Sequence, residues 1–336
     1  MSTITSTTTQ RSIGPHNTTL KLIMEELQSY LSGPSTVALA LLAVVTVGWI
    51  LLAGFSPQEP NYTPPFAIQS SEHKASVIVP AYQEQPNIRP LCERVFKATR
   101  ADDLAIELII VDDNSNDGSE EVVKELQAEG YDIKIEVRTK VRGLSTAVMH
   151  GFDKAKNEVM MVMDADLQHP PEIVPKLLRP LLSNKAHFAI GTRYAVGGGT
   201  ENWAFHRRLI SWTATALAWP IAPVSDPMTG LFAIRKSLYA TGRDLDPRGF
   251  KIGLELMVKC APHHTAEVPY LFGGRLLGES KLETKAQVDF IVHMMMLYWY
   301  KLPTLITSPK VVFFVAALAM VTMQLVSTVW DTKKHV

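Results

Sequence analysis

The apolar residues of this chain form short runs through its central part and one long run near each end. Five short apolar runs with strand propensity occupy residues 75–80, 106–113, 133–139, 158–166 and 187–193. Amphipathic helical patterns separate them, near residues 87–100, 118–129, 144–156 and 171–183. Because the short runs are apolar almost throughout, we expect strands that are buried on both faces. The alternation predicts an α/β domain with a mostly parallel, doubly wound sheet.

The two long apolar runs predict membrane helices at both ends of the chain. Residues 36–55 and 311–330 are uncharged over 20 residues each, which at about 1.5 Å per residue suffices to cross a bilayer. A buried core helix is the alternative for each run. The first is not a cleaved signal, because the ten residues at the N-terminus carry no basic residue.

A third segment, residues 287–307, combines apolar and aromatic residues with Asp289, His293 and Lys301. This mixture predicts amphipathic helices in the membrane interface, with a third crossing as the alternative. Phe290 and Trp299 would line the entry of a lipid or anchor the segment.

The remaining segments complete the predicted organisation. We expect a partly disordered segment at 1–35, a proline-rich linker at 56–70 and a catalytic domain at 71–286, followed by the interfacial segment and the second membrane helix, with a basic tail at 331–336. Asn17 and Asn61 begin N-x-T sequons, but such short motifs occur often by chance, so we assign a glycan to neither.

Overall charge and cysteine content exclude some classes of function. The chain has 33 Lys and Arg against 33 Asp and Glu, so it lacks the basic excess of nucleic-acid-binding proteins. Cys92 and Cys260 are too few for a disulfide framework, and we expect both in the core.

Acidic residues follow three of the predicted strands. Glu84 follows the first, Asp112 and Asp113 end the second, and Asp164 and Asp166 end the fourth. Ligands of open α/β sheets bind beyond the carboxyl ends of the strands, so these groups should converge on one rim. Crowded carboxylates repel each other, and we therefore expect a cation among them.

Asp164 and Asp166 are the candidate ligands of a divalent cation. In an extended segment they would point to the same side, with Gln168 next on that side and Ala165 facing away. Oxygen ligands of this kind suit Mg²⁺ or Mn²⁺, which are often shared with substrate phosphates. His169 is expected to be a packing or hydrogen-bonding neighbour rather than a ligand of the metal.

Several nucleotide and hydrolase motifs are absent from the sequence. The first strand leads into PAYQEQPN instead of G-x-G-x-x-G, and there is no Walker A, H-E-x-x-H or G-x-S-x-G sequence. The glycines at 197–199 predict a flexible loop over the site.

Nine segments, in order between about residues 75 and 283, resemble the dolichol-phosphate mannosyltransferases. They are SVIVPAYQEQPNI, LIIVDDNSNDGS, RGLSTAVMHGF, VMDADLQHPPE, GTRYAVGG, RRLIS, VSDPMTGLFAIRK, GFKIGLELMVK and EVPYLFGGRLLGESKL. Members of that family are inverting family-two glycosyltransferases of GT-A fold. The resemblance therefore implies that fold, and the transfer of mannose from GDP-mannose to dolichyl phosphate with Mg²⁺ or Mn²⁺ as cofactor.

The resemblance also implies roles for individual residues. The guanosine end of the donor would contact Pro80, Tyr82, Glu84, Asp112 and Asp113, and the metal would bind Asp164, Asp166 and Gln168. The donor would also contact Arg193, Arg275 and Lys281, whereas Arg207, Ser225 and Asp226, in or near the acceptor loop 225–230, would receive the acceptor phosphate. Catalysis itself would rest on Asp166, Arg207, Arg275 and Lys281.

Two other functions stay open on the sequence. One is a polyprenyl-phosphate glucosyltransferase that uses UDP-glucose and shares the metal site. The other is a catalytically silent, membrane-bound subunit that binds a lipid phosphate or a nucleotide, although the complete acidic set argues against it.

The predicted location is the endoplasmic reticulum membrane, with the catalytic domain on the cytosolic side where GDP-mannose is found. Accessory subunits are not expected to be required, because the chain has membrane segments of its own. The final residues, KKHV at 333–336, resemble a dilysine retrieval signal. A single crossing would place them in the lumen, so either they are an ordinary basic flank or residues 287–330 cross twice.

Overall fold

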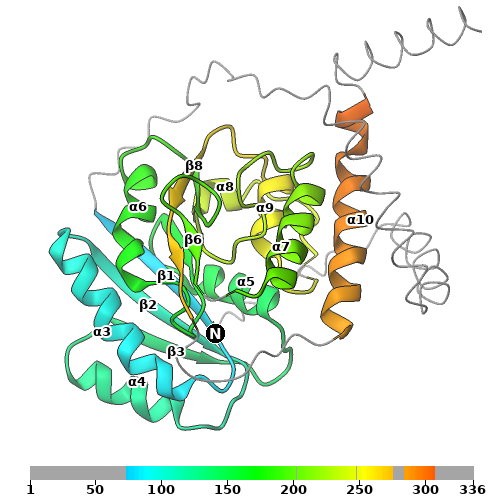
Figure 1. Cartoon of the computed structure of the whole chain (residues 1–336). Helices are drawn as coiled ribbons and strands as arrows, with labels where there is room; N and C mark the ends of the chain where they lie inside the picture. The colour runs from blue at the N-terminus through cyan, green and yellow to red at the C-terminus, as the bar shows by residue number, and fades with distance from the viewer. Residues whose placement is uncertain (1–72, 202, 247, 275–283, 307–336) are drawn as a thin grey trace, which may run out of the picture. The chain divides into compact units, whose positions relative to one another are not determined.

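The computed structural model of the chain describes residues 73–201, 203–246, 248–274 and 284–306 (Figure 1). The N-terminal segment 1–35, the runs 36–55 and 311–330, the linker, the basic tail and both sequons lie outside the described residues. Within the described ranges, no helix combines the length and the apolar character needed to cross a membrane.

A mostly parallel sheet forms the centre of the described domain. Its strands lie in the order β3-β2-β1-β4-β7-β5-β8, and only β7 runs antiparallel to its neighbours. The bounds are β1 Lys74–Ala81, β2 Ala105–Asp112, β3 Ile133–Val137, β4 Val159–Val162, β5 Phe188–Thr192, β7 Phe232–Arg235 and β8 Thr265–Pro269. This is the GT-A-like α/β architecture that the sequence predicts.

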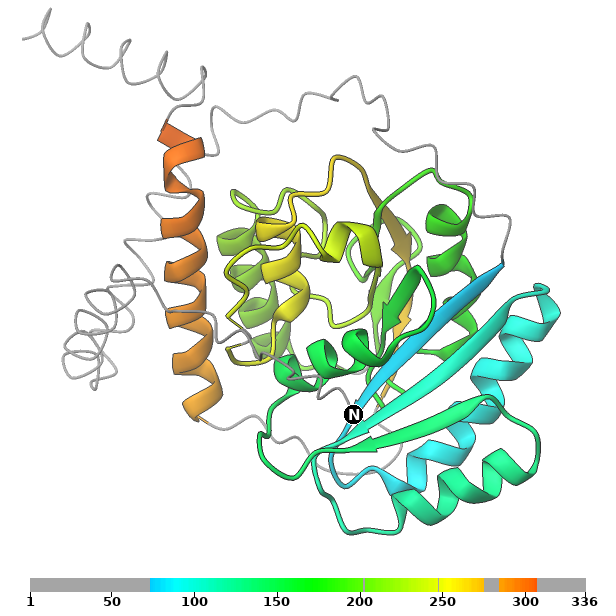
Figure 2. The same cartoon turned by 180° about the vertical axis from the view of Figure 1, so that it is seen from behind.

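Helices cover both faces of the sheet, which confirms the doubly wound arrangement. One apolar core lies under three helices, α3 (Gln85–Ala101), α4 (Ser119–Ala128) and α6 (Val174–Leu182). The short 3-10 helix η1 (Pro171–Ile173) leads directly into α6. The other core lies under α5 (Leu144–Lys154), α9 (Ile252–Lys259) and the end of α7 (Phe205–Ala218), near the short α8 (Lys236–Tyr239). Figure 2 shows α3 and α4 together beside the β1–β3 half of the sheet.

The long helix α10 (Thr284–Ile306) packs on the second core through Met294 and Leu297, both at most 5% exposed. Its Tyr298 hydroxyl donates a hydrogen bond of 2.7 Å to the Leu217 carbonyl at the end of α7. The segment predicted at 287–307 is therefore one helix within the described residues, and one side of it belongs to the core.

The structure corrects three details of the sequence prediction. Strand β4 ends at Val162 rather than at 166, and the four-residue strand β7, which the sequence pattern did not reveal, lies between β4 and β5. Part of the glycine stretch 197–199 is also paired, because β6 (Gly199–Thr200) forms a small sheet with β9 (Leu271–Phe272).

Candidate active site

The Asp-x-Asp segment forms a tight turn after β4, so strand alternation does not orient its carboxylates as the sequence suggested. The turn depends on Leu167, whose φ of 60° lies in the left-handed region that non-glycine residues rarely adopt. The backbone amide of Gln168 donates to Asp166 Oδ1 at 3.1 Å, and the Gln168 side chain donates to the Gly273 carbonyl at 3.2 Å. The turn, not a strand, therefore groups Asp166 with Gln168.

His169 packs beside this turn and hydrogen-bonds to it, as the sequence predicted. Its Nδ1 accepts a 3.1 Å hydrogen bond from the Asp164 amide, and its ring contacts Tyr270 and Phe272 edge-on. The side chain is 1% exposed, and this burial lowers its pKa to about 4. The imidazole is therefore neutral near pH 7 and fixes the backbone next to Asp164.

The residues of the turn fit a divalent cation that shares its coordination with a substrate. The Asp164 side chain is 35% exposed at the rim, whereas Asp166 and Gln168 are each 7% exposed. Gly230 leaves room beside them, because a Cβ there would lie 3.4 Å from Asp164 Oδ2. The described residues contain no group of three or more His, Cys, Asp or Glu that could hold a metal alone. Two carboxylates completed by phosphate and water oxygens are a usual arrangement for Mg²⁺.

The carboxyl ends of β1 and β2 form the adjoining edge, where the nucleotide residues were predicted. The amide of Gln83 donates to Ser115 Oγ at 2.8 Å, which ties the loop after β1 to the loop after β2. Pro80, the last residue but one of β1, lies opposite Val111. Glu84 precedes α3 and accepts a 2.7 Å hydrogen bond from Asn87. These loops bring the predicted nucleotide residues to one edge.

The two aspartates at the carboxyl end of β2 have protein partners of their own. Asp112 accepts hydrogen bonds from the amide and hydroxyl of Ser115, the former at 2.9 Å. Asp113 accepts from Arg138 Nε and from the Gly143 amide, each at 2.7 Å. The sequence led us to expect a cation among these carboxylates. At Asp113 that cation is a side chain of the protein itself, an arginine that organises the loop before α5.

Arg142 is a second cation at this edge that the sequence reasoning missed. Its guanidinium carbon lies 5.1 Å from the Tyr82 ring centroid, and it donates to the Asn114 carbonyl at 3.3 Å. Its place in RGLSTAV, one residue before Gly143, was the available signal. The pair places a planar cation beside a predicted nucleotide residue.

Arg193 and Asp226 form a buried ion pair beside the Asp-x-Asp turn. Arg193 donates to both carboxylate oxygens, at 2.7 and 2.8 Å, and its backbone amide also donates to Asp226 at 3.1 Å. Burial alone would lower the pKa of Arg193, but hydrogen bonds and the charge of Asp226 outweigh it and raise that pKa. The side chains are 8% and 0% exposed. Asp226 thus orients Arg193.

Ser225 lies next to this pair at the end of β5. Its hydroxyl lies 2.6 Å from the Thr192 hydroxyl, and its amide donates to Glu267 Oε2 at 3.0 Å. The predicted acceptor loop is therefore tied to β5 and β8 at its start.

Lys251 is a further charged group of the site that the sequence reasoning did not single out. It precedes α9 and donates a 2.6 Å hydrogen bond to the Met228 carbonyl in the acceptor loop. Burial, reinforced by Arg193, lowers its pKa to about 8, while the charges of Asp226 and Asp164 oppose that shift. The segment GFKIGLELMVK carried the signal, but only the fold brings this lysine beneath the site.

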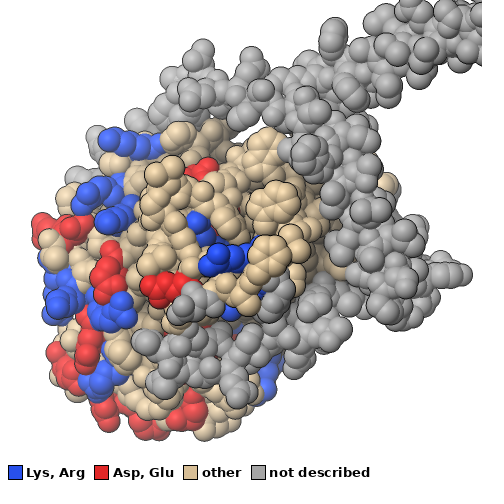
Figure 3. Space-filling view, viewed as in Figure 1, with Lys and Arg blue, Asp and Glu red and all other residues tan. Residues whose placement is uncertain are grey.

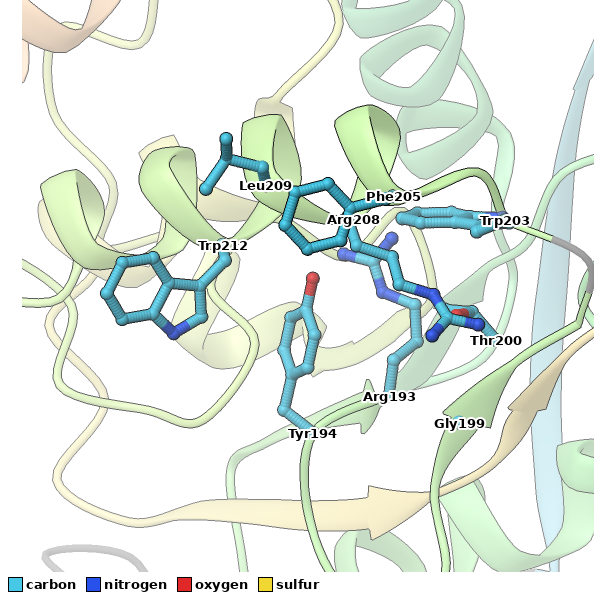
Figure 4. A pocket seen from close by; sticks show the side chains of 9 residues that line it. All are labelled: Arg193, Tyr194, Gly199, Thr200, Trp203, Phe205, Arg208, Leu209 and Trp212. Carbon is cyan, nitrogen blue, oxygen red and sulfur yellow. The ribbon is translucent and has the colours of Figure 1, made fainter.

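An open groove of about 610 Å³ runs from Arg193 along α7 (Figure 4). It is lined by Arg193, Tyr194, Gly199, Thr200, Trp203, Phe205, Arg208, Leu209 and Trp212. Phe205 is 81% exposed and Trp212 59%, so the first turns of α7 present apolar side chains to the outside. The groove joins a cationic end to an apolar wall.

The surface around this groove differs from the rest of the described face. Lys, Arg, Asp and Glu gather over α3 and α4, whereas uncharged surface predominates over α7 (Figure 3).

The structure places one of the three remaining predicted basic residues. The guanidinium carbon of Arg207, in the first turn of α7, lies 4.2 Å from the Trp203 ring centroid. Arg275 and Lys281 lie outside the described residues.

Comparison with known proteins identifies the family of the chain. Residues 76–242 match the family model described as glycosyl transferase family 2. A dolichol-phosphate mannosyltransferase of Mycosarcoma maydis is 47% identical over 258 residues, covering 74% of this chain and 87% of the relative. The enzyme of the same name from Saccharomyces cerevisiae is 47% identical over 236 residues, covering 67% and 87%. The chain belongs to the dolichol-phosphate mannosyltransferases.

Membership of this family confirms the resemblance stated from the nine sequence segments. Among solved structures, the chain is similar to glucosyl-3-phosphoglycerate synthase from Mycobacterium tuberculosis, with a TM-score of 0.47 and 19% identity. That likeness covers 70% of this chain and 85% of the other.

Proposed function

We propose that this chain transfers mannose from GDP-mannose to dolichyl phosphate with inversion, giving dolichyl β-mannosyl phosphate and GDP. The observation that carries the proposal is 47% identity to a named enzyme over 87% of its length. The geometry supports it, because a carboxylate turn, a nucleotide edge and a cationic groove meet beyond the carboxyl ends of the strands.

The donor would lie across the edge formed by the loops after β1 and β2. Tyr82 and Arg142 offer planar surfaces for a base, and the loop containing Asp112 is held by Ser115. The diphosphate would then reach the Asp164–Gln168 turn, where Asp164 is accessible. A divalent cation bound there would supply the positive charge that stabilises the departing diphosphate.

The acceptor needs no general base. The second pKa of a phosphate monoester is about 6, so dolichyl phosphate already offers an anionic oxygen near neutral pH. That oxygen forms the new bond to the anomeric carbon, and the bonding electrons to the diphosphate oxygen leave with GDP. One displacement of this kind inverts the α-linkage of the donor.

The arginines of the groove would bring the two anions together. Arg193 uses Nε and one Nη on Asp226, and its other N–H groups can still meet a phosphate, because guanidinium has five donors. Arg207 is exposed in the first turn of α7, where the acceptor phosphate would arrive. Asp226 keeps Arg193 aligned and is itself too well paired to meet a phosphate directly.

We place the enzyme at the endoplasmic reticulum membrane with its catalytic domain toward the cytosol. The exposed apolar residues of α7 support contact with a polyprenyl chain. The uncharged runs at 36–55 and 311–330 support retention in the bilayer.

The proposal is tested with the purified full chain in detergent, with radiolabelled GDP-mannose, dolichyl phosphate and Mg²⁺. We expect transfer of mannose and little transfer from UDP-glucose. Asp166→Asn keeps an oxygen that can accept the Gln168 amide but loses the charge, and we expect transfer to fall at least about 100-fold.

Asp102→Asn is the matched control, because Asp102 pairs with Arg179 on the surface at 2.6 Å. This control should retain activity and the same requirement for Mg²⁺. Transfer at the wild-type rate by Asp166→Asn, or equal use of UDP-glucose, would contradict the proposal.

A further inference from the structure

The indole of Trp203 contacts charged side chains from two different elements. The guanidinium carbon of Arg193, which follows β5, lies 5.2 Å from the ring centroid, and that of Arg207 in α7 lies 4.2 Å from it. Both distances fall within the range of cation–π attraction, for which Trp is the strongest aromatic partner. Trp203 is therefore in contact with the donor-side and the acceptor-side arginine together.

Trp203 itself is held by the part of the structure that supports the Asp-x-Asp turn. Phe272 of β9 meets the indole edge-on, with ring centroids 5.5 Å apart. The same Phe272 lies 5.5 Å from the ring of His169, which accepts the hydrogen bond from the Asp164 amide. One packed aromatic series thus extends from the carboxylate turn to the start of α7.

The two arginines differ in their exposure to solvent. Arg193 is buried and held by Asp226 through two side-chain hydrogen bonds. Arg207 is exposed, and a long exposed side chain loses rotamer entropy when it is ordered by a ligand. An aromatic face that already restricts the guanidinium reduces that loss on binding.

We propose that Trp203 is a positioning residue that holds Arg207 beside the Arg193–Asp226 pair, so that the acceptor phosphate is received at a set distance from the donor. This inference rests on the proposed function, because it takes Arg207 as the residue that binds the acceptor phosphate. It assigns Trp203 an effect on the acceptor and none on the nucleotide.

A purely structural role for Trp203 predicts a different result. The indole is partly buried and packs against the core under α3, α4 and α6. If it served only as packing, Trp203→Leu would affect fold, donor and acceptor alike. Trp203→Phe, which keeps more volume than Leu and a ring that can pack on Phe272, would then partly recover all three properties together. A positioning role instead requires an aromatic face beside Arg207, so Trp203→Leu changes the acceptor KM alone and Trp203→Phe restores it.

The experiment compares Trp203→Leu, Trp203→Phe and Arg207→Gln in the full chain in detergent. It measures KM for dolichyl phosphate, the affinity for GDP and the thermal unfolding midpoint. We expect Trp203→Leu to raise the acceptor KM about two- to fivefold, the equivalent of one exposed cation–π contact. GDP affinity should stay unchanged, and Trp203→Phe should recover most of the lost acceptor affinity.

The double variant Trp203→Leu/Arg207→Gln adds a test of coupling. We expect its acceptor KM to match that of Arg207→Gln alone, since the indole would act through that arginine. An acceptor KM that rises in Arg207→Gln but not in Trp203→Leu overturns the positioning role and leaves the proposed function intact. Equal losses of GDP affinity and acceptor affinity in Trp203→Leu also overturn it. If Arg207→Gln itself leaves the acceptor KM unchanged, the acceptor role of Arg207 fails.

Discussion

At the scale of single residues, the site contains a buried ion pair between Arg193 and Asp226. Asp226 is fully buried and bound in a two-point contact to Arg193. Asp226→Ala leaves that guanidinium buried without its carboxylate, and we expect the free energy of unfolding to fall by about 3–5 kcal/mol. Arg179→Ala, which breaks the exposed Arg179–Asp102 pair, should cost only about 0–1 kcal/mol. Equal shifts of the two denaturation midpoints would contradict this reading.

Lys251 gives a prediction about pH. Its pKa falls from 10.5 to about 8 in the folded chain, chiefly through burial. Between these values the unfolded chain binds more protons than the folded chain, so the contribution of Lys251 to stability rises with pH. We expect wild type to gain stability relative to Lys251→Met between pH 8 and pH 10.5. A difference that stays constant across denaturation curves at those two pH values would show that the amine is not buried as described.

The sequence predicted the acidic residues of the site better than the basic ones. The acidic residues stand at or just after the ends of apolar strands, so sheet topology brings them to one edge; they are Asp112, Asp113, Asp164 and Asp166. Lys251 reaches the site only because the start of α9 lies against the acceptor loop, where this lysine donates to the Met228 carbonyl. The partner of Asp113, Arg138, lies 25 positions further along the chain. Such contacts depend on tertiary packing, which has no local pattern in the sequence.

At the scale of elements, continuous apolar runs were sufficient to predict five strands, and the amphipathic patterns between them were sufficient to predict four helices. Strand β7 was missed because four residues, Phe232–Arg235, are too few to show a period. The prediction placed the end of β4 at residue 166 instead of Val162, because it counted the acidic residues that follow as part of the strand. Only the φ of Leu167 reveals that the chain turns there. Short elements and turns are therefore the features that the sequence pattern predicted least well.

Helix α10 gives a prediction at the same scale. Its His293 Nε2 lies 3.3 Å from Glu255 Oε2 in α9, with both side chains at most 4% exposed. His293→Ala removes a buried ring that lies against a buried carboxylate, and we expect the free energy of unfolding to fall by about 1–3 kcal/mol. We expect amide hydrogen exchange to increase in residues 284–306, with β1 and β2 unchanged. Met295→Ala is the control, because Met295 lies on the same helix and is 42% exposed. Unchanged exchange in α10 of His293→Ala would contradict this role.

At the scale of the whole molecule, two neighbouring helices expose apolar residues. Met295, Trp299 and Leu302 of α10 are 40–64% exposed, and their spacing of four and three residues places them on one face. Tyr298 connects this helix to the end of α7, whose first turns expose Phe205, Ile210 and Trp212. We infer that both helices contact the surface of the bilayer from which dolichyl phosphate is drawn.

The two aromatic residues predicted to line the lipid entry should therefore behave differently. The ring centroid of Phe290 lies 6.5 Å from that of Phe250, and Phe290 packs against the core. Trp299, in contrast, is 64% exposed. Trp299→Ser should raise the KM for dolichyl phosphate in detergent and leave the unfolding midpoint near that of wild type, because the change removes interfacial contact only. Phe290→Ser should lower the unfolding midpoint, since it removes a ring from the packing between α10 and the core. If Trp299→Ser leaves the KM for dolichyl phosphate unchanged, the exposed face of α10 serves only to anchor the protein to the membrane. A stable Phe290→Ser variant would mean that α10 is held mainly by its contacts at Glu255 and Leu217.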